Sequence, residues 1–497
     1  MSPPTVPAPR RALRRVAGLA ALGVALASAP AQADTLRDAL AAAYNTNPTL
    51  AGARANQRAT DEEVPIQRGQ GLPSLNATAT HIEFIRQSAN AFAPPERNLG
   101  VNAQLNVPIY QGGRIRNSIR AAEERVEAGQ ADLRGAESAL FSQTVAAYMD
   151  VLRTEALAGL ATNQVEVLEV TLSATRDRFE IGDTTLTDVA QAESRLALAE
   201  GDLRNALANL ASARETYIEL VGLPPEDLEA PPPLPNLPDS VGKAVVTALE
   251  NNPDLIAARE RAEAAGFDTE VAGSGRLPTI AFFANGDYSD FFGTLRSNFP
   301  GLVQREVTAN AGVRLTIPIF QGGVPAARQR QAGARESAAL EQMIQTERNV
   351  ISQVRAAYAS WQASLAVIES SRSAVEAAEL SLEGVRAENS IGNRTILDVL
   401  NAEQELVSAR AQLVTARRNA YVAGFSLLAA MGRAEARDLN LDTGGPLYDP
   451  TVNYERVRGR IWDWDRDPEP QAESTRTVDI PAADATFGPL LEPGERQ

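Results

Sequence analysis

Two Thr-x-x-Asp motifs place carboxylates at the spacing of a helix capping box. They are Thr185–Asp188 and Thr395–Asp398. In such a box the acid accepts hydrogen bonds at the first turn of a helix, where a negative charge is also favourable. This chemistry stabilises the start of a helix and needs no substrate, so the motifs by themselves predict local structure only.

Sequence patterns that accompany catalysis are missing. HExxH, GxSxG and Gly-x4-Gly-Lys-Ser/Thr do not occur, and the one histidine, His81, stands in a strand-like segment. A lone histidine of this kind is more often a surface residue than a base or a metal ligand. We therefore predict no enzyme, no catalytic residue, no metal and no cofactor.

Charge and cysteine content narrow the possible partners. The 497 residues carry a formal net charge of −16, whereas binding to nucleic acid needs concentrated lysine and arginine. The absence of cysteine excludes disulfides and a lipid anchor on an N-terminal cysteine. Any attachment to a membrane must therefore come from the fold.

Residues 1–33 have the features of a secretory signal peptide. Four arginines between positions 10 and 15 precede the apolar stretch Val16–Ala27, and Ala31-Gln32-Ala33 matches an A-x-A cleavage site. Cleavage near Ala33 removes these four arginines and no acid, so the net charge changes from −16 to −20. After this segment no run of 18 apolar residues predicts a membrane-spanning helix.

The chain contains two copies of one plan, roughly 34–222 and roughly 240–432. Matching motifs lie 205 positions apart up to the strand pair of each copy and 210 positions apart after it. The matches are Asn47-Pro48-Thr49-Leu50 with Asn252-Pro253-Asp254-Leu255, Leu72-Pro73-Ser74 with Leu277-Pro278-Thr279, Gln111-Gly112-Gly113 with Gln321-Gly322-Gly323, Gly182 with Gly392, and Asp188 with Asp398. About five extra residues are therefore expected between the two strands of the second copy.

Each copy begins with a helix that opens at Asn-Pro and continues with a pair of strands. In the second strand of each pair, apolar residues alternate with polar or small ones. The apolar residues are Leu99, Val101, Ala103, Leu105 and Val107 in copy one, and Val307, Ala309, Ala311, Val313, Leu315 and Ile317 in copy two. Strands of about 9–11 residues cross a bilayer at a tilt, and long polar loops join each pair. A half-buried strand of a soluble sandwich would show the same alternation.

Two long helices follow the strands in each copy. About 70 residues without proline lead from Gly113 to Ile181, which at about 1.5 Å per residue makes a rod of roughly 100 Å. After Gly182, and again after Gly392, large and small apolar residues alternate at spacings of three and four. This pattern is typical of closely packed coiled coils. A soluble antiparallel coiled coil would account for the helices but not for the strands.

Two strand pairs give four strands per chain, whereas a membrane barrel needs about eight or more and leaves no open edge. The chain must therefore oligomerise if it forms a barrel, to eight strands as a dimer or to twelve as a trimer.

Each strand pair ends in the same way, with VPIYQGG at 107–113 and IPIFQGG at 317–323. Proline cannot donate to the strand ladder and belongs where a strand leaves its sheet. The glycines then let the backbone turn before the helix. We expect the transitions from strand to helix at Pro108, Gly112, Gly113, Pro318, Gly322 and Gly323.

Together these motifs resemble the TolC family of outer membrane channels over about 35–432, in both copies and in order. The resemblance also rests on the turns Ile181-Gly182-Asp183 and Ile391-Gly392-Asn393, each followed by Thr-x-x-Asp-Val. It implies an α+β membrane protein that is a homotrimer. A 12-stranded outer membrane β-barrel would be continued by a 12-helix periplasmic α-barrel, with four strands and long coiled-coil helices from each duplicated chain.

The resemblance also implies a function and partners. The protein would be a passive exit duct, gated at its periplasmic tip, in a tripartite efflux pump or a type I secretion system of a Gram-negative bacterium. It would pass drugs, small molecules or proteins. The implied partners are a periplasmic adaptor (membrane fusion) protein, an inner-membrane transporter of the RND, ABC or MFS type, and outer membrane lipid. The alternative is a periplasmic coiled-coil adaptor or scaffold without a pore, which would not need duplicated hairpins.

At the helical tips the resemblance assigns roles to single residues. Asp398 matches the first of two aspartates that ring the closed entrance and bind cations, but the second position is Asn401, so a trimer would have three ring carboxylates instead of six. Arg394 matches an arginine of a lock between neighbouring coiled coils. The positions of its partners are Thr187 and Asp188, and Asn389 replaces a tyrosine of the lock. The residues that would meet the adaptor are Ile181, Gly182, Asp183, Ile391, Gly392 and Asn393.

The predicted segments follow from the repeat and the resemblance. They are a signal peptide (1–33), periplasmic helices (34–71), a barrel hairpin (72–110), a coiled-coil helix pair (111–222), a proline-rich equatorial linker (223–239), then periplasmic helices (240–276), a barrel hairpin (277–320), a coiled-coil helix pair (321–432) and an acidic, proline-rich tail (433–497). The tail is predicted to be disordered in the periplasm. Its Arg460–Asp465 stretch is the one apolar patch within it. The patch could dock on the helical barrel or on another envelope component, or belong to a loosely packed tail.

Overall fold

The computed structural model describes residues 35–86, 95–295, 301–441 and 443–483. The predicted signal peptide lies outside these residues. Copy one contains the helices and strands α1 (Leu36–Thr46), α2 (Pro48–Asp61), α3 (Glu63–Gly69), β1 (Ser74–Glu83), β2 (Arg97–Tyr110), α4 (Arg114–Glu180) and α5 (Leu186–Val221). Copy two contains α6 (Val241–Asn251), α7 (Pro253–Gly273), the 3-10 turn η1 (Ser274–Arg276), β3 (Thr279–Asp290), β4 (Arg305–Thr316), α8 (Val324–Ser390) and α9 (Ile396–Ala430), and α10 (Pro450–Val457) follows.

The four strands form one antiparallel sheet in the order β1-β2-β3-β4. Its register confirms the repeat residue by residue. Ser74 pairs with Asn106 in the first hairpin, and Thr279 pairs with Thr316 in the second. Ser74 and Thr279 lie 205 positions apart, and Asn106 and Thr316 lie 210 positions apart. The extra residues of copy two therefore lie at the far end of its hairpin. There β3 and β4 stay paired as far as Asp290 and Arg305, two residues beyond the equivalents of Glu83 and Arg97, so most of the expected loop insertion lengthens the strands instead.

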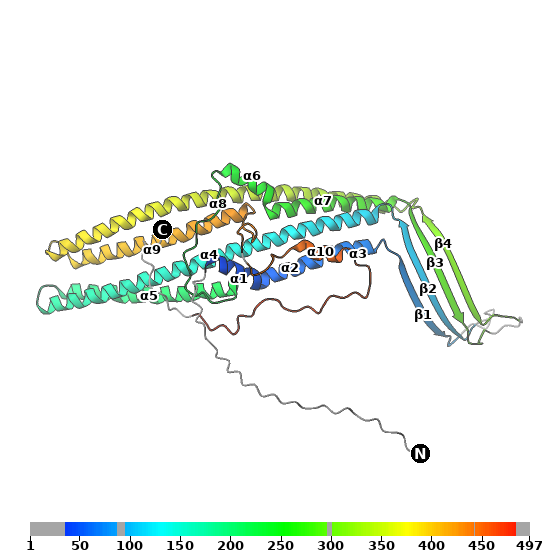
Figure 1. Cartoon of the computed structure of the whole chain (residues 1–497), viewed down its shortest axis with the longest axis horizontal. Helices are drawn as coiled ribbons and strands as arrows, with labels where there is room; N and C mark the ends of the chain where they lie inside the picture. Colours follow the sequence, from blue (N-terminus) through cyan, green and yellow to red (C-terminus); the bar gives the residue numbers. More distant parts are fainter. Residues whose placement is uncertain (1–34, 87–94, 296–300, 442, 484–497) are drawn as a thin grey trace, which may run out of the picture. The chain divides into compact units, whose positions relative to one another are not determined.

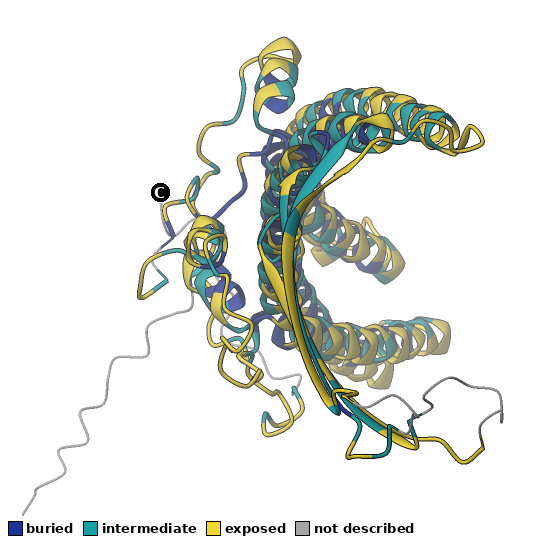
Figure 2. Cartoon of the chain, turned by 90° about the vertical axis from the view of Figure 1, so that its right-hand side faces the viewer, coloured by how far each residue is buried: buried dark blue, intermediate teal, exposed yellow. Residues whose placement is uncertain are grey.

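The long helices lie side by side in one curved layer that continues from the sheet (Figures 1 and 2). On the tip side α4 packs between α5 and α9, and α8 packs on the far side of α9. Toward the sheet, α2 and α3 lie against one side of α4, while α7 lies between α4 and α8. Both α4 and α8 have 67 residues, as the unbroken helical pattern predicted for copy one. No helix among the described residues is long and apolar enough to cross a membrane.

Asn47 and Asn252 join helices end to end at equivalent places in the two copies. The Oδ1 atom of Asn47 accepts from Thr49 N at the start of α2, while its Nδ2 atom donates to Leu220 O at the end of α5. Asn252 repeats this between α7 and α9, with Ala430 O as the acceptor. A helix start and a helix end both expose unpaired backbone groups, and one amide side chain satisfies both. The Asn-Pro motif is thus confirmed as a helix start. In its second role Asn47 joins the end of α5 to the start of α2, so that these two shorter helices together run along the longer helix α4.

The main hydrophobic core lies where these helix ends meet. It includes Tyr44 of α1, Phe141 and Tyr148 of α4, Tyr217 of α5 and Phe425 of α9. The linker 223–239 crosses it and is held by Tyr148, whose hydroxyl donates to Glu229 O over 2.7 Å.

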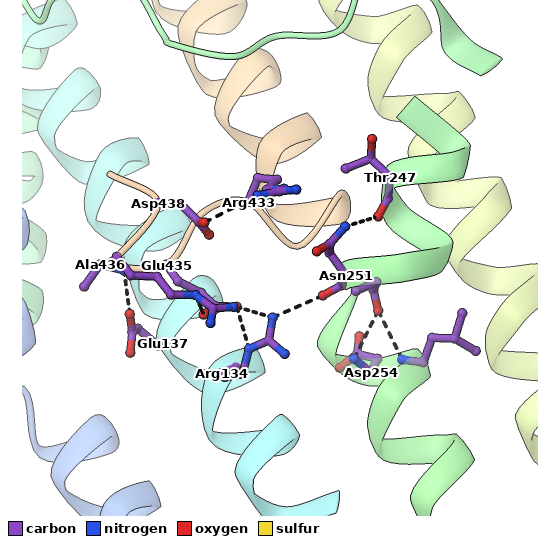
Figure 3. Close-up of polar contacts among 12 residues, drawn as sticks. Arg134, Glu137, Thr247, Asn251, Asp254, Arg433, Glu435, Ala436 and Asp438 are labelled. Carbon is purple, nitrogen blue, oxygen red and sulfur yellow. Dashed lines mark hydrogen bonds and ion pairs between the residues drawn. The ribbon is translucent and has the colours of Figure 1, made fainter. Parts of the chain in front are cut away.

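A polar clamp fixes the chain after α9 onto α4 (Figure 3). Arg134 of α4 donates to Glu435 over 2.8 Å and to Asn251 O over 3.3 Å. Glu137, one turn further along, accepts from Ala436 N over 2.6 Å. Burial raises the pKa of Glu137, and the Ala436 amide only partly offsets this effect.

The prediction of a disordered tail from 433 onward is wrong for much of that segment. Ala434, Ala436 and Leu441 are buried in the main core, and α10 packs on α2. The helix also binds α2 through Asn453, whose Nδ2 atom donates to Asp61 over 2.6 Å. Local composition does not reveal this order, because it comes from contacts with residues almost 400 positions earlier in the chain.

The two long helices differ in burial although they are repeat equivalents. In α4, 23 residues are buried, whereas in α8 five are. The difference arises because α4 has helices of the chain on both sides, while α8 lies at an edge of the helical layer (Figure 2).

Candidate functional site

Each helix pair ends in a tight turn that exposes apolar side chains. Gly182 and Gly392 have φ values of +81° and +79°, a conformation that glycine adopts without strain. Ile181 and Ile391 before them are 80% and 71% exposed. The turns predicted at these residues are therefore confirmed, and a docking role for them stays a prediction.

Asp188 and Asp398 occupy equivalent places just after these turns. Each closes a capping box, in which Oδ2 accepts from the backbone N and the hydroxyl of the preceding threonine, Thr185 or Thr395. The hydrogen bonds from Thr185 and Thr184 lower the pKa of Asp188, and those from Thr395 lower the pKa of Asp398. The capping function is confirmed, and both carboxylates remain charged near neutral pH. The cation-binding ring stays a prediction for Asp398.

Arg394 and Asn389 belong to the turn of the second hairpin. Arg394 Nε donates to Glu388 Oε2 over 2.8 Å, and Asn389 Nδ2 donates to Arg394 O over 2.8 Å. Within one chain the structure does not bring Arg394 to Thr187 or Asp188. The lock between hairpins therefore stays a prediction about an assembled protein.

Asn401 has a partner that sequence reasoning missed. Arg195 Nη2 of α5 donates to Asn401 Oδ1 of α9 over 2.9 Å. The contact links the two hairpins near their tips, where Leu400 of α9 also packs against Leu168 and Ala199 of the first hairpin. A basic residue facing Asn401 could not be inferred from the spacing of either helix, because the two helices belong to different copies.

A groove lies between the two hairpins close to the tips. Its walls include Val170 and Arg178 of α4, Arg386 of α8, and Glu403 of α9. Glu403 has a 5% exposed side chain, and its Oε1 atom accepts from Arg386 Nη2 over 3.0 Å. Its other oxygen has no hydrogen-bond partner among the described residues. The groove therefore combines apolar walls with an ion pair in which the Glu403 carboxylate is buried and the Arg386 side chain is half exposed, a feature that the sequence does not predict.

At the first strand-to-helix transition, glycine is required by close packing. Gly113 is the N-cap of α4 with φ +81°, and Gly112 has φ +63°. A Cβ atom on Gly112 would lie 2.8 Å from Leu277 Cβ and 3.1 Å from Ser274 O. Pro108 is inside β2 and not at its end, a correction to the prediction. The strand can hold it because β1 pairs only as far as Asn106, so that beyond this point β2 pairs with β3 alone.

The second transition has the same backbone but lacks these neighbours. Gly322 and Gly323 have φ values of +59° and +79°, and nothing described lies within 4 Å of a Cβ atom on either. Pro318 follows the end of β4 at Thr316, as predicted. The transition in copy two is therefore open where that of copy one is packed.

The sheet also ends in open edges. Among the described residues, the outer edges of β1 and β4 pair with no other strand. Apolar side chains stand exposed on both strands, including Leu75, Val307 and Val313. An exposed apolar sheet with unpaired edges is unfavourable in water.

Acidic side chains gather on α4 and α7. Oxygens of Glu124, Glu260 and Glu263 all lie within 4.8 Å of one another. Burial, followed by the contact with Glu260, raises the pKa of Glu124 to about 7. The cluster consists of acids alone, and we assign no ion to it.

Comparison with known proteins agrees with this geometry. The sequence pattern described as "Outer membrane efflux protein" matches twice, at residues 39–223 and 244–433, which correspond to the two copies. The outer membrane efflux protein BepC of Brucella suis is 32% identical over 439 residues, a stretch that covers 88% of this chain and 93% of BepC. The outer membrane protein TolC of Escherichia coli is 27% identical over 425 residues, covering 83% of this chain and 85% of TolC.

Solved structures share the fold at lower identity. VceC of Vibrio cholerae superimposes with a TM-score of 0.68 at 23% identity, over 80% of this chain and 96% of VceC. The CmeC outer membrane channel of Campylobacter jejuni gives a TM-score of 0.71 at 16% identity, over 85% and 89% of the two chains. The channel fold predicted from the sequence is therefore confirmed, and the chain belongs to the outer membrane efflux protein family.

Proposed function

We propose that three copies of this chain form a passive exit duct across the outer membrane, closed at its helical tips. The observation that carries the proposal is the pair of open edges on a duplicated, curved sheet. Four strands cannot close a barrel, whereas twelve strands from three copies can. In the assembled protein, β4 of each chain pairs with β1 of the neighbouring chain.

The repeat gives the register of this joint. Inside the chain, β2 of copy one pairs with β3 of copy two, and Leu105 faces Ala284. Adding 210 to the first position and subtracting 205 from the second gives the equivalent pair between chains. Leu315 of one chain of the trimer then faces Ala79 of the neighbouring chain, and Val313 faces His81 in the same way.

The helical layer closes by the same rule. Arg125 of α4 bonds Asp268 of α7 over 2.5 Å inside the chain. The equivalent residues are Arg335, exposed on α8, and Glu63 on α3. Arg335 and Glu63 have the same charges as the internal pair. The edge of α8 is therefore complementary in charge to α3 of the neighbouring chain in the trimer. This contact covers the helix that is poorly buried in a single chain.

Members of this family lie in the outer membrane and extend into the periplasm. We propose that the tips receive cargo from a periplasmic adaptor and an inner-membrane transporter of the RND, ABC or MFS type. Ile181 and Ile391 are the exposed apolar residues at the two turns where an adaptor would dock. AprF is described as an alkaline protease secretion protein and CzcC as a cobalt-zinc-cadmium resistance protein, so relatives of this chain serve different cargoes.

Disulfide trapping tests the assembly. The chain has no cysteine, so introduced cysteines react without background. Directly opposed residues have Cβ atoms about 4.5–5.5 Å apart, within reach of a disulfide, while diagonal ones lie about 7–8 Å apart. Chains carrying both Leu315→Cys and Ala79→Cys are expected to form covalently closed trimers on non-reducing gels.

The matched control is Leu315→Cys with Ala77→Cys, which shifts the pair by two residues on the same face of the strand. Weaker crosslinking of the control supports the register. Equal crosslinking of both pairs would contradict the register but not the trimer, and covalent dimers alone would contradict the trimer.

A further inference from the structure

Two of the three tryptophans of the chain stand exposed in one short loop of the tail. We name residues 461–466 the tryptophan loop. Trp462 and Trp464 are 72% and 75% exposed, and Ile461 beside them is 68% exposed. Exposed tryptophan at this density is unusual for a surface in water, and it indicates a surface that is covered in the working protein.

The structure fixes where the loop begins. Val457, the last residue of α10, is completely buried, and Tyr454 packs against Val64 of α3 and Val126 of α4. Arg68 Nη1, in the last turn of α3, donates to Arg458 O over 3.0 Å. The tryptophan loop therefore starts from a docked helix and is tied to the end of α3.

A latch of ion pairs closes the loop on itself. Asp467 accepts from Arg456 over 2.7 and 2.9 Å and from Arg460 over 2.7 Å. These two guanidinium groups hold the pKa of Asp467 well below its usual range, so the latch stays charged across the physiological pH range. Because the residues on either side of the loop are joined, its apolar side chains project as a unit.

The loop stands close to the base of the sheet. Arg68 precedes the first residue of β1, Ser74, by six positions, which an extended chain spans in at most about 20 Å. In Figure 1 the tail turns back beside the end of α3, at the side that faces the sheet. In Figure 2 this part of the chain lies on the convex side of the curved layer, the side that faces outward when the sheet closes into a barrel.

We propose that the tryptophan loop inserts into the headgroup layer of the periplasmic leaflet of the outer membrane. Tryptophan is enriched at membrane–water interfaces, where its ring is apolar and its N–H remains hydrated. The interface adds several ångströms of polar layer to each side of the hydrocarbon core, toward the position of the loop. Each chain of a trimer would contribute one loop, giving three anchors around the barrel base.

The charges around the loop give it no preference for anionic lipid. Residues 458–467 contain three arginines and three aspartates, so their formal charges cancel. Basic segments bind anionic lipid by charge, and this one has no net charge with which to do so. We therefore expect insertion to be driven by the tryptophans and to depend weakly on the fraction of anionic lipid.

Tryptophan fluorescence tests the proposal on the full-length protein in bilayers. The substitution Trp361→Phe leaves Trp462 and Trp464 as the only tryptophans. The protein is reconstituted into phosphatidylethanolamine and phosphatidylglycerol bilayers that contain lipids brominated high or low on the acyl chain. We expect blue-shifted emission, a roughly twofold loss of intensity with bromine near the headgroup, and a smaller loss with bromine near the chain end.

Two variants separate insertion from mere proximity. Asp467→Asn weakens the latch and should reduce quenching by brominated lipid, whereas Asp479→Asn, an exposed acid further along the tail, should leave it unchanged. Emission typical of water-exposed tryptophan, quenched by iodide but not by brominated lipid, overturns the proposal. Shielding from both quenchers overturns it in favour of a protein partner.

Discussion

Arg195 of α5 donates a hydrogen bond to Asn401 of α9 over 2.9 Å, and so joins the two coiled-coil hairpins of one chain close to their tips. In the sequence, Asn401 stands where a second ring carboxylate is expected. The structure shows that the position also holds the hairpins together. A carboxylate placed there would face a guanidinium group.

This relationship sharpens the prediction for Asn401→Asp. In that variant the new carboxylate is expected to form a charge-assisted bond with Arg195, which strengthens the link between the hairpins. Block of the channel by polyvalent cations should increase modestly, because the arginine offsets part of the added charge. Removing the arginine as well, in Asn401→Asp with Arg195→Ala, should give the strongest block.

Titration of the block with a polyvalent cation in planar bilayers measures this effect. Arg204→Ala, an exposed arginine on the same helix, serves as the control. If the block in the double variant equals that of the unmodified protein, the assignment of positions 398 and 401 to the entrance ring is wrong.

The asparagines that join helices should matter for stability in both copies. Asn47→Ala and Asn252→Ala each remove an N-cap and a bond to the end of a helix later in the chain, α5 for Asn47 and α9 for Asn252. Loss of the cap alone costs about 1 kcal/mol. Thermal dissociation of the trimer should therefore occur at a lower temperature in both variants and be unchanged in Asn163→Ala, an exposed control on α4. Unchanged dissociation in all three would mean that the junctions contribute nothing.

The two transition glycines should fail at different stages. Gly112→Ala places a Cβ atom against Leu277 of the same chain in a left-handed backbone, so it is expected to impair folding of the chain itself. The Cβ atom of Gly322→Ala has no neighbour within 4 Å in the described part of its own chain. Repeat symmetry places Leu72 of the neighbouring chain next to this Cβ atom. This variant should yield folded chains that form fewer heat-labile trimers. Comparing chain yield with trimer yield distinguishes the two, and identical defects in both variants would contradict the assigned neighbour.

The acidic cluster predicts a pH dependence. The pKa of Glu124 is raised from 4.5 to about 7 by burial and by Glu260, Glu127 and Glu263. The folded state therefore binds this proton more tightly than the unfolded state, and stability is lost as the pH rises from 4.5 through about 7. Glu124→Gln should stabilise the protein at pH 8 and lose this advantage near pH 4.5.

The midpoint of thermal unfolding, measured across this pH range, checks the sign. Glu169→Gln, an exposed acid on the same helix, is the matched control and should show no such trend. A stabilisation by Glu124→Gln that is larger at pH 4.5 than at pH 8 would reverse the sign and refute the assignment.

The sequence predicted those parts of the fold whose signals are local and repeated. The 67-residue helices, the capping boxes at Asp188 and Asp398 and the turns at Gly182 and Gly392 all follow from short-range patterns that occur twice. The hairpin register follows from the two offsets. Duplication made each of these signals readable, because a motif found once is weak and found twice in order is specific.

Contacts between distant segments could not be predicted. The partner of Asn401 lies 206 positions away, and the docking of α10 on α2 joins residues 392 positions apart. The order of the tail depends on these tertiary contacts, since its composition alone resembles that of a disordered segment. The position of Pro108 inside β2 likewise depends on where the neighbouring strand ends, which the strand itself does not encode.

Ion conductance of the purified protein in planar bilayers tests most directly whether it is a channel closed at its tips. We expect a small, cation-selective conductance that increases in Arg195→Ala, because this variant removes a link between the hairpins, and that does not change in Arg204→Ala. Anion preference would contradict the account, and so would the absence of any conductance from trimers of both the unmodified protein and Arg195→Ala.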